Sequence, residues 1–141
     1  MTTDNFFVFD TNVLISAVMD INSLAAESLL KARRQGRLLI SHEVTEEYLS
    51  VFSRKKFDKW ISFETRIQFI ENIIENSILV NATQQVSACR DNKDNMFLSL
   101  ALSSQANCIV SSDKDLLVLH PFSGIPILSP AAFLMLQSFE P

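Results

Sequence analysis

Four acidic side chains lie at positions from which they could act together on a phosphate group. Asp10 and Asp113 each follow a short apolar run and precede a helical pattern. Asp94 opens a helical pattern, and Glu47 lies on the helical pattern after another apolar run. If the apolar runs are neighbouring parallel strands, their carboxyl ends share one edge of the sheet, where open α/β sheets bind ligands. We therefore expect acids far apart in the chain to meet there.

Carboxylates gathered in this way need a neutralising partner. Two unit charges about 4 Å apart, at an effective dielectric of about 20, repel by roughly 4 kcal/mol, and several such pairs would equal a domain's whole stability of about 5–15 kcal/mol. Because the set contains oxygen ligands only, the expected cofactor is Mg²⁺ or Mn²⁺. Such ions suit phosphoryl chemistry, in which one ion activates water and a second can stabilise the departing oxygen.

A simpler interpretation exists for the first of these positions. Asp10 and Asn12 stand between an apolar run at residues 6–9 and a helical pattern at residues 13–19. Asp and Asn are favoured residues at the N-cap of a helix. From this stretch alone, a helix cap and a functional site both remain open.

Five short apolar runs are the predicted strands. Residues 6–9 are four consecutive large apolar residues, which is typical of a strand covered on both faces in a parallel sheet. Pro126 cannot donate a ladder hydrogen bond, so the last strand is expected at an edge. The other predicted strands are residues 38–40, 77–80, 107–110 and 125–128.

Helical patterns separate these runs. Ser23 is a good N-cap, Ser41 and Ser129 begin later helices, and Gly36 follows Arg33 and Arg34 as a helix stop. The predicted helices cover residues 13–19, 24–35, 41–52, 64–76, 94–101, 116–119 and 129–136, and residues 81–90 are expected to form a loop. Strands alternate with helices throughout, so the pattern predicts an α/β sandwich on a mostly parallel, roughly five-stranded sheet.

Length and charge limit the classes of function. The chain has 141 residues, 48% hydrophobic and 20% charged, which predicts one folded domain spanning residues 1–141. A net charge of −4 does not suit a non-specific nucleic-acid binder, whose affinity comes from excess Lys and Arg. It does not exclude a nuclease, because clustered site acids lower the pI and bound metal ions offset them locally.

The cysteines and the N-terminal residues indicate the cellular compartment in which the protein is expected. Cys89 and Cys108 have neither metal-like nor redox-like spacing, so reduced thiols in a cytoplasmic protein are expected. Residues 1–5 contain an acid and no basic run, unlike a signal peptide. No apolar run is long enough to span a bilayer, so no membrane partner is expected.

Five short motifs follow one another in a fixed order along the chain: Phe9-Asp10-Thr11-Asn12-Val13, Glu47-Tyr48-Leu49, Arg54-Lys55-Lys56-Phe57, Asp91-Asn92-Lys93-Asp94-Asn95 and Ser111-Ser112-Asp113-Lys114-Asp115-Leu116. This ordered set resembles the PIN domain, and more narrowly its bacterial branch of VapC-like toxin components of toxin–antitoxin pairs. The resemblance runs from the first strand to the last helix. Its strength lies in the order of the set, since a single D-T-N occurs by chance.

The resemblance implies a three-layer α/β/α fold and a metal-dependent endoribonuclease that hydrolyses RNA phosphodiester bonds with metal-activated water. It carries the catalytic and metal-ligating roles onto Asp10, Glu47, Asp94 and Asp113, and supporting roles onto Thr11, Asn12, Ser111 and Asp115. It also implies RNA as substrate, a small antitoxin protein as partner and a homodimer. Between two neighbouring glutamates it favours Glu47 over Glu46.

Several residues keep two interpretations. Asp91 fits a helix cap as well as a ligand, and His42 fits a surface position as well as one behind the site. Trp60 fits a dimer interface or a helical arm. The basic clusters fit solvated helix ends or contacts to RNA phosphates; they comprise Arg54, Lys55 and Lys56, and Arg33, Arg34 and Arg37.

Three other classes of protein share parts of this pattern. A haloacid-dehalogenase-like phosphohydrolase also begins with a strand ending in Asp, but it needs a second Asp two residues on, where this chain has Asn12. A response-regulator receiver domain needs an early acidic pair and an Asp after the third strand, and this chain has neither at those positions. The third alternative is a catalytically inactive PIN-like domain that only binds a protein partner, which all four acids argue against.

Overall fold

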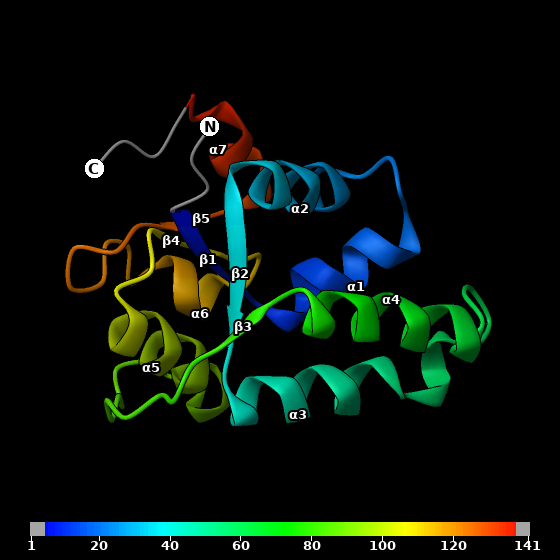
Figure 1. Ribbon diagram of the computed structural model, residues 1–141, viewed down its shortest axis with the longest axis horizontal. Helices are drawn as coiled ribbons and strands as arrows, with labels where there is room; N and C mark the ends of the chain where they lie inside the picture. The colour runs from blue at the N-terminus through cyan, green and yellow to red at the C-terminus, as the bar shows by residue number, and fades with distance from the viewer. Residues whose placement is uncertain (1–4, 138–141) are drawn as a thin grey trace.

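Five parallel strands form one sheet in the computed structural model, which describes residues 5–137 (Figure 1). The strand order is β3-β2-β1-β4-β5. The strands are β1 (Asn5–Phe9), β2 (Gly36–Ile40), β3 (Ile78–Leu79), β4 (Cys108–Val110) and β5 (Ile127–Leu128). The predicted strands and their parallel pairing are confirmed, and β5, the strand after Pro126, lies at an edge.

Helices connect successive strands. They are α1 (Thr11–Met19), α2 (Leu24–Gln35), α3 (His42–Phe52), α4 (Phe63–Glu75), α5 (Asn95–Ser104), α6 (Lys114–Leu117) and α7 (Pro130–Met135), with single 3₁₀ turns η1 (Lys55–Phe57) and η2 (Asn92–Asp94). Ser23 caps its helix as predicted, and Ser41 and Ser129, which were expected to begin their helices, are also N-caps; each accepts a backbone N–H. Leu136 was expected in the last helix but is its C-cap, because its backbone is extended.

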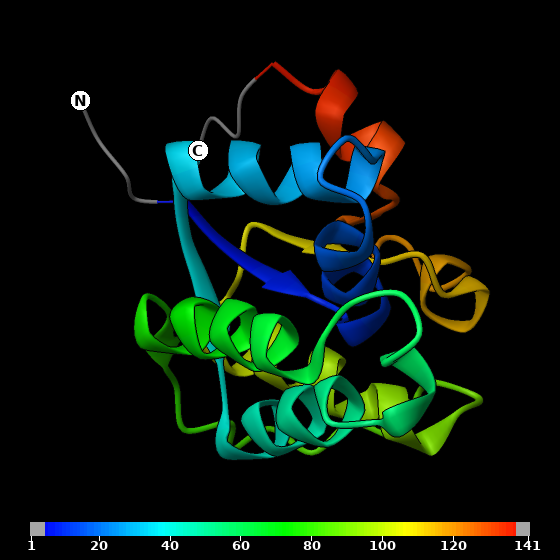
Figure 2. The same ribbon diagram turned by 90° about the vertical axis from the view of Figure 1, so that its right-hand side faces the viewer.

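The helices cover both faces of the sheet. In Figure 2, α2 and α7 lie above β1 and β2, whereas α3, α4 and α5 lie below them. Within these layers α2 packs against α1 and α7, and α3 packs against α4. The arrangement is the predicted three-layer α/β/α sandwich.

Strand β1 lies at the centre of the hydrophobic core. Phe7, Val8 and Phe9 are fully buried. The ring of Phe133 on α7 packs edge-on against Phe7 and Phe9, with centroid distances of 5.3 and 6.3 Å. Because both faces of β1 are covered, its carboxyl end, where Asp10 follows, is held firmly in place.

Strand β2 begins earlier than the sequence pattern indicated. It starts at Gly36, directly after α2, and Gly36 pairs with Asn5. A Cβ atom at position 36 would lie 1.9 Å from the Asn5 carbonyl oxygen, so only glycine allows the two strands to meet there. This tertiary requirement cannot be seen in the local pattern, which predicted a strand starting at Leu38.

Residues 81–90 contain no helix or strand, in agreement with the predicted loop. The loop lies along α5, where the Gln84 N–H donates to Ser103 Oγ at 3.0 Å and the Ser99 hydroxyl donates to the Gln84 carbonyl. Over residues 5–137, no single helix is long and apolar enough to cross a membrane. Helices α1 and α2 reach that length only jointly, with a bend of 110° between them.

Candidate active site

Asp10 both caps α1 and links the ends of two strands. Its Oδ1 accepts the Val13 N–H at 2.9 Å, as an N-cap does. Its Oδ2 accepts the Ser111 hydroxyl and the Ser112 N–H, the latter at 3.2 Å, from the segment after β4. The side chain is 3% exposed, and burial raises the pKa of Asp10, although these three hydrogen bonds oppose the rise. The cap and site interpretations are therefore compatible.

Ser111 holds two of the predicted acids in a fixed relation. Its buried hydroxyl donates to Asp10 and accepts the Asp113 N–H at 2.9 Å. The Asp113 carboxylate in turn accepts the Asp115 N–H at 2.9 Å and caps α6. The carboxyl ends of β1 and β4 are thus joined through one serine side chain.

Asp94 approaches the pair from the start of α5. Burial, a hydrogen bond to the Asp113 side chain and the negative charges of Asp113, Asp91 and Asp10 together raise the pKa of Asp94 to about 8, with burial as the largest cause. At neutral pH, Asp94 is therefore protonated and donates to Asp113. A shared proton lets these two carboxyl groups stand side by side.

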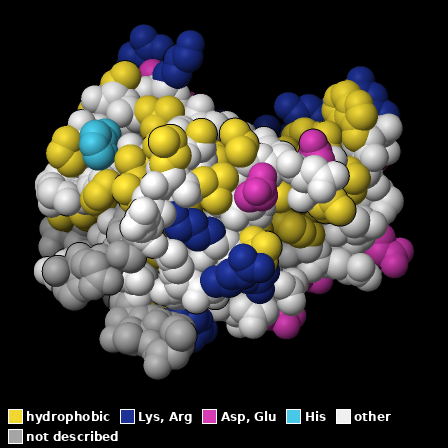
Figure 3. All heavy atoms as spheres, turned by 90° about the horizontal axis from the view of Figure 1, so that it is seen from above, with side chains coloured by type: hydrophobic (Ala, Val, Ile, Leu, Met, Phe, Trp, Pro, Cys, Tyr) yellow, Lys and Arg dark blue, Asp and Glu magenta, His cyan; other side chains and the backbone are white. Residues whose placement is uncertain are grey.

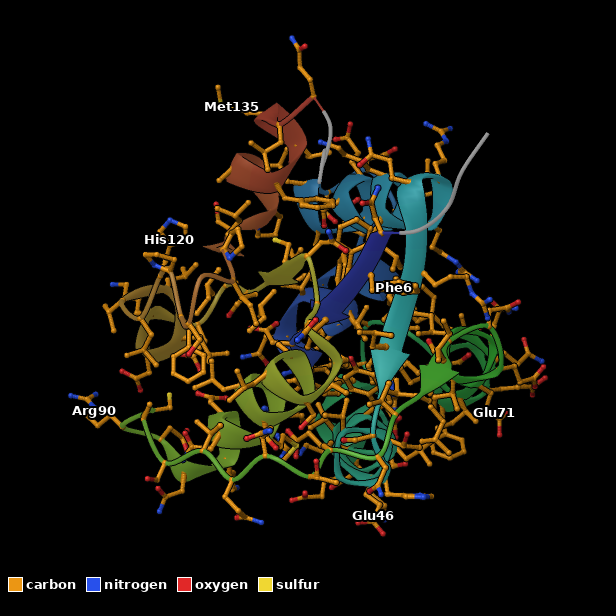
Figure 4. The ribbon with its side chains drawn as sticks, turned by 60° about the vertical axis from the view of Figure 1, so that its left-hand side comes forward. Phe6, Glu46, Glu71, Arg90, His120 and Met135 are labelled. Carbon is orange, nitrogen blue, oxygen red and sulfur yellow. The ribbon has the colours of Figure 1, made fainter. Side chains whose placement is uncertain are left out.

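The four predicted acids line one small cavity of about 40 Å³. Its lining residues are Asp10, Thr11, Asn12, Glu47, Asp94, Phe97 and Asp113. A polar cavity of this size can hold water. The acids therefore meet at the carboxyl edge of the sheet, as the strand order required. Glu47 is half-buried on α3, whereas Glu46 is exposed and points away from the sheet in Figure 4.

Within residues 5–137, no group of three or more His, Cys, Asp and Glu side chains is arranged to hold a metal ion. The cavity nevertheless brings together four carboxyl groups. These groups share one cavity, but their present positions are not those of a set of metal ligands. Carboxylates without a cation repel one another, and here a proton remains between Asp94 and Asp113. A metal ion would replace that proton.

The hydroxyl of Thr11 also bears on whether the cavity suits a metal ion. Thr11 is 4% exposed and lines the cavity, yet its Oγ1 has no hydrogen-bond partner within the described part of the chain. A buried hydroxyl without a partner costs about 1–3 kcal/mol. A water molecule or oxygen ligand in the cavity would satisfy it, so the residues present suit a hydrated hard cation in donor type and charge.

The remaining predicted site residues lie around the cavity or away from it. Asp115 is outside the lining and pairs with Arg90 at 3.6 Å. Asp91 accepts the Lys93 N–H at 3.0 Å and caps η2, which supports its interpretation as a cap. His42 is exposed at the start of α3. The basic cluster of Arg54, Lys55 and Lys56 is exposed beyond the end of α3 and does not line the cavity.

Sequence reasoning did not assign three residues that support the site. The buried Tyr48 hydroxyl donates to the Phe9 carbonyl at 2.5 Å, and burial and the charge of Asp10 raise the pKa of Tyr48. Cys89 Sγ lies 3.9 Å from Asp94 Oδ2 and 3.4 Å from the Asp115 carbonyl. Phe97 forms an apolar wall, and its position three residues after Asp94 on a helix could have indicated it.

Comparison with known proteins places this geometry in a family. The solved VapBC2 complex of Rickettsia felis bound to a DNA fragment from its promoter contains a chain of similar fold, with a TM-score of 0.61 at 12% identity over 88% of this chain and 98% of that one. The PAE2754 protein of Pyrobaculum aerophilum gives a TM-score of 0.61 at 14% identity, over 95% and 96% of the two chains. DNA-bound VapBC of Salmonella typhimurium gives a TM-score of 0.58 at 17% identity, over 89% and 98%.

Comparison of sequences identifies the family as well as the fold. An uncharacterized protein of Methanocaldococcus jannaschii is 32% identical over 115 residues, which cover 80% of this chain and 74% of that protein. The family model of the PIN domain matches residues 7–115, a span that begins in β1 and ends just after Asp113. Because that span contains all four acids of the cavity, and because the match extends over most of the chain, this protein belongs to the PIN domain family.

Proposed function

We propose that this protein is a metal-dependent endoribonuclease and the toxin component of a toxin–antitoxin pair. The observation that carries the proposal is the cavity in which Asp10, Glu47, Asp94 and Asp113 meet from four segments of the chain. Membership of the PIN domain family and the likeness to chains of solved VapBC complexes support it. The bacterial branch remains part of the proposal, since the M. jannaschii relative is archaeal.

Asp10, Asp94 and Asp113 would hold Mg²⁺ or Mn²⁺, with Glu47 as a further or water-mediated ligand. When bound, the ion supplies charge neutralisation and activation of water for attack on a phosphodiester. The three hydrogen bonds to Asp10 fix its carboxylate plane, so its remaining lone pairs point in constant directions. Ser111 orients Asp10 and Asp113 together, and the Thr11 hydroxyl is available to hold a water molecule.

A cleavage assay with a fluorescently labelled RNA, Mn²⁺ and an EDTA control tests the nuclease. Asp10→Asn is expected to abolish Mn²⁺-dependent cleavage, and Glu46→Gln, an exposed change on α3, is expected to leave it unchanged. Because the new amide faces the Ser112 N–H, Asp10→Asn could lower stability, so Asp94→Asn is measured beside it with a thermal melt. Full activity in both folded variants would rule the proposal out.

Metal binding is tested separately by thermal melting. A cation that binds only the folded chain stabilises it by about 2.7 kcal/mol at one hundred times its dissociation constant. We expect Mn²⁺ to raise the melting temperature of the wild type and not of Asp94→Asn. No rise in the wild type would favour an inactive, interaction-only domain.

The antitoxin partner is tested by co-expression. The proposal expects that the product of a small neighbouring reading frame co-purifies with this chain and suppresses its RNA cleavage. A neighbouring product that binds without affecting cleavage would contradict the toxin assignment but not the nuclease.

A further inference from the structure

The connection between α3 and α4, residues 53–62, is the most basic exposed segment next to an exposed aromatic side chain. Arg54, Lys55, Lys56 and Lys59 are all exposed. Trp60, the single tryptophan of the chain, is 59% exposed. This density of positive charge contrasts with the net charge of −4 for the whole chain.

A fully buried arginine on α4 fixes the shape of this connection. Arg66 donates to the carbonyls of Phe52, Arg54 and Ile61 at 2.9, 3.1 and 2.6 Å, and to the carboxylate of Asp58 at 2.9 Å. Burying an arginine is costly unless such partners surround it. Here almost all of its hydrogen bonds go to the backbone on either side of the exposed cations.

Two phenyl rings complete this anchor. The guanidinium carbon of Arg66 lies 5.8 Å from the ring centre of Phe57 and 5.7 Å from that of Phe63. Asp58, the single acid of residues 53–62, is bound to Arg66 and so does not offset the exposed lysines. The connection therefore presents a preformed positive surface rather than a flexible loop.

Trp60 is the exposed apolar part of this surface. The backbone N–H of Trp60 donates to the Phe57 carbonyl at 3.1 Å, and Lys59 Nζ lies 4.5 Å from the centre of the Trp60 ring. A large ring left open to solvent beside several cations matches the surfaces on which single-stranded nucleic acids stack their bases while lysines and arginines hold the phosphates. A duplex keeps its bases stacked inside and could not use the ring in this way.

The connection follows the helix that contributes Glu47 to the cavity. Helix α3 carries Glu47 in its middle, and Ser53 follows six residues later, about 9 Å along the helix axis. In Figure 1 the connection lies at the right-hand end of the molecule, whereas α6, which begins after Asp113, lies at the left, so the connection borders the cavity only on the α3 side. In Figure 3, basic and hydrophobic side chains lie together at the right-hand end of the molecule, where the connection projects.

We propose that residues 53–62 form a stacking platform for a single-stranded segment of the RNA substrate, with Trp60 stacking on a base and Arg54, Lys55, Lys56 and Lys59 binding phosphates. The proposal rests on RNA being the substrate of the nearby cavity. It assigns the basic cluster and the exposed tryptophan to one surface.

The single tryptophan makes a direct test possible. The intact protein is titrated in EDTA, so that no cleavage occurs, with a single-stranded oligouridylate, an abasic oligomer of equal length and a duplex. The tryptophan emission reports on Trp60 alone. We expect the single strand to change it at saturation and the abasic oligomer and the duplex to change it far less.

Variants separate stacking from charge. The affinities of the variants are measured from the fluorescence anisotropy of a dye-labelled strand, because the Trp60 variants have no tryptophan. Trp60→Ala is expected to raise the dissociation constant for the single strand about tenfold, and Trp60→Phe to restore most of the affinity. Met135→Ala, a change at an exposed hydrophobic side chain on α7, is the control and should bind as the wild type does. Lys55→Gln with Lys56→Gln should weaken all three ligands and reduce the salt dependence of binding.

Three outcomes would overturn the platform. The first is a tryptophan emission that saturating RNA does not change, and the second is equal RNA affinities of Trp60→Ala and Met135→Ala. The third is an emission that changes when the protein alone is diluted, because this would place a second copy of the chain over Trp60. Mn²⁺-dependent cleavage by the wild type is measured in parallel. If the wild type cleaves RNA but Trp60→Ala and Met135→Ala bind it with equal affinity, only the platform is refuted. If RNA binds through Trp60 but is not cleaved, only the nuclease is refuted.

Discussion

Asp94 and Asp113 hydrogen-bond to each other through their side chains, although one opens α5 and the other follows β4. Burial and this contact raise the pKa of Asp94 to about 8. The arrangement resembles other carboxyl pairs that share one proton because two like charges cannot both be accommodated. It gives the metal-free protein a distinctive dependence on pH.

We predict that the metal-free protein loses stability as pH rises from about 4 to about 8. The folded chain keeps a proton on Asp94 up to about pH 8, whereas the unfolded chain releases it near pH 3.9. Between these values the folded state binds more protons, so the free energy of unfolding falls as pH rises. Urea unfolding in EDTA at several pH values measures the effect.

Asp94→Asn is the control that isolates this contribution. The variant cannot ionise at position 94, so its stability should fall less steeply over the same range, ending about 1 kcal/mol above the wild type at pH 8 after allowance for solvent screening of a partly buried group. Parallel curves for the two proteins would show that Asp94 does not hold the shared proton.

Ser111→Ala should weaken catalysis more than it weakens the fold. The change removes a donor to Asp10 and an acceptor for the Asp113 N–H, so both carboxylates lose a fixed orientation. Loss of a group that orients metal ligands typically costs about 10- to 100-fold in activity. The buried N–H left without its partner costs about 1–3 kcal/mol of stability.

Ser112→Ala is the matched comparison for that experiment. Ser112 is exposed and contributes its backbone N–H to Asp10, which alanine retains. RNA cleavage rates and urea unfolding of the two variants are measured together. Equal rates for both would mean that the Ser111 hydroxyl does not position the acids.

The general plan of this site could be predicted from the sequence because it depends on topology. A buried strand followed by Asp10, and another followed by Asp113, place both acids at the carboxyl edge of any parallel sheet in which the strands are neighbours. The structure pairs β1 directly with β4, so the acids converge. The sequence around Asp10 could not decide between a helix cap and a site residue, because Asp10 has both roles.

Cys89 shows what such reasoning cannot reach. It lies in residues 81–90, which have no helical or strand periodicity, and its N–H is held at 2.8 Å by the side chain of Asn95. Its position next to Asp94 therefore depends on this bond and on the contact of its Sγ with the Asp115 carbonyl, neither of which a local pattern shows. Tyr48 was likewise visible only as an apolar member of a helical pattern, although its hydroxyl binds the end of β1.

Gly36→Ala should destabilise the fold strongly. The added methyl group would meet the Asn5 carbonyl oxygen at 1.9 Å, so β1 and β2 would have to separate at their first pair. Overpacking of this kind costs about 1–3 kcal/mol and occasionally more, and we expect the upper end because both contacting groups are backbone. Thermal and urea unfolding measure the loss.

Gly124→Ala provides the comparison within the same chain. Its Cβ would meet no atom within 4 Å, but its φ of 81° is a conformation that glycine favours. That change should cost about 1 kcal/mol through backbone strain alone. A smaller loss for Gly36→Ala than for Gly124→Ala would contradict the close approach of β1 and β2.

Arg66→Met tests whether the anchor, rather than the exposed cations alone, maintains the α3–α4 connection. The substitution keeps an apolar side chain of similar length but leaves the carbonyls of Phe52, Arg54 and Ile61 without their donor. We expect a loss of about 2–4 kcal/mol in unfolding free energy and faster amide hydrogen exchange over residues 53–62. Asp58→Asn removes only the exposed partner, whose ion pair should contribute at most about 1 kcal/mol. If the two variants lose equal stability and exchange alike, the backbone bonds of Arg66 do not fix this segment.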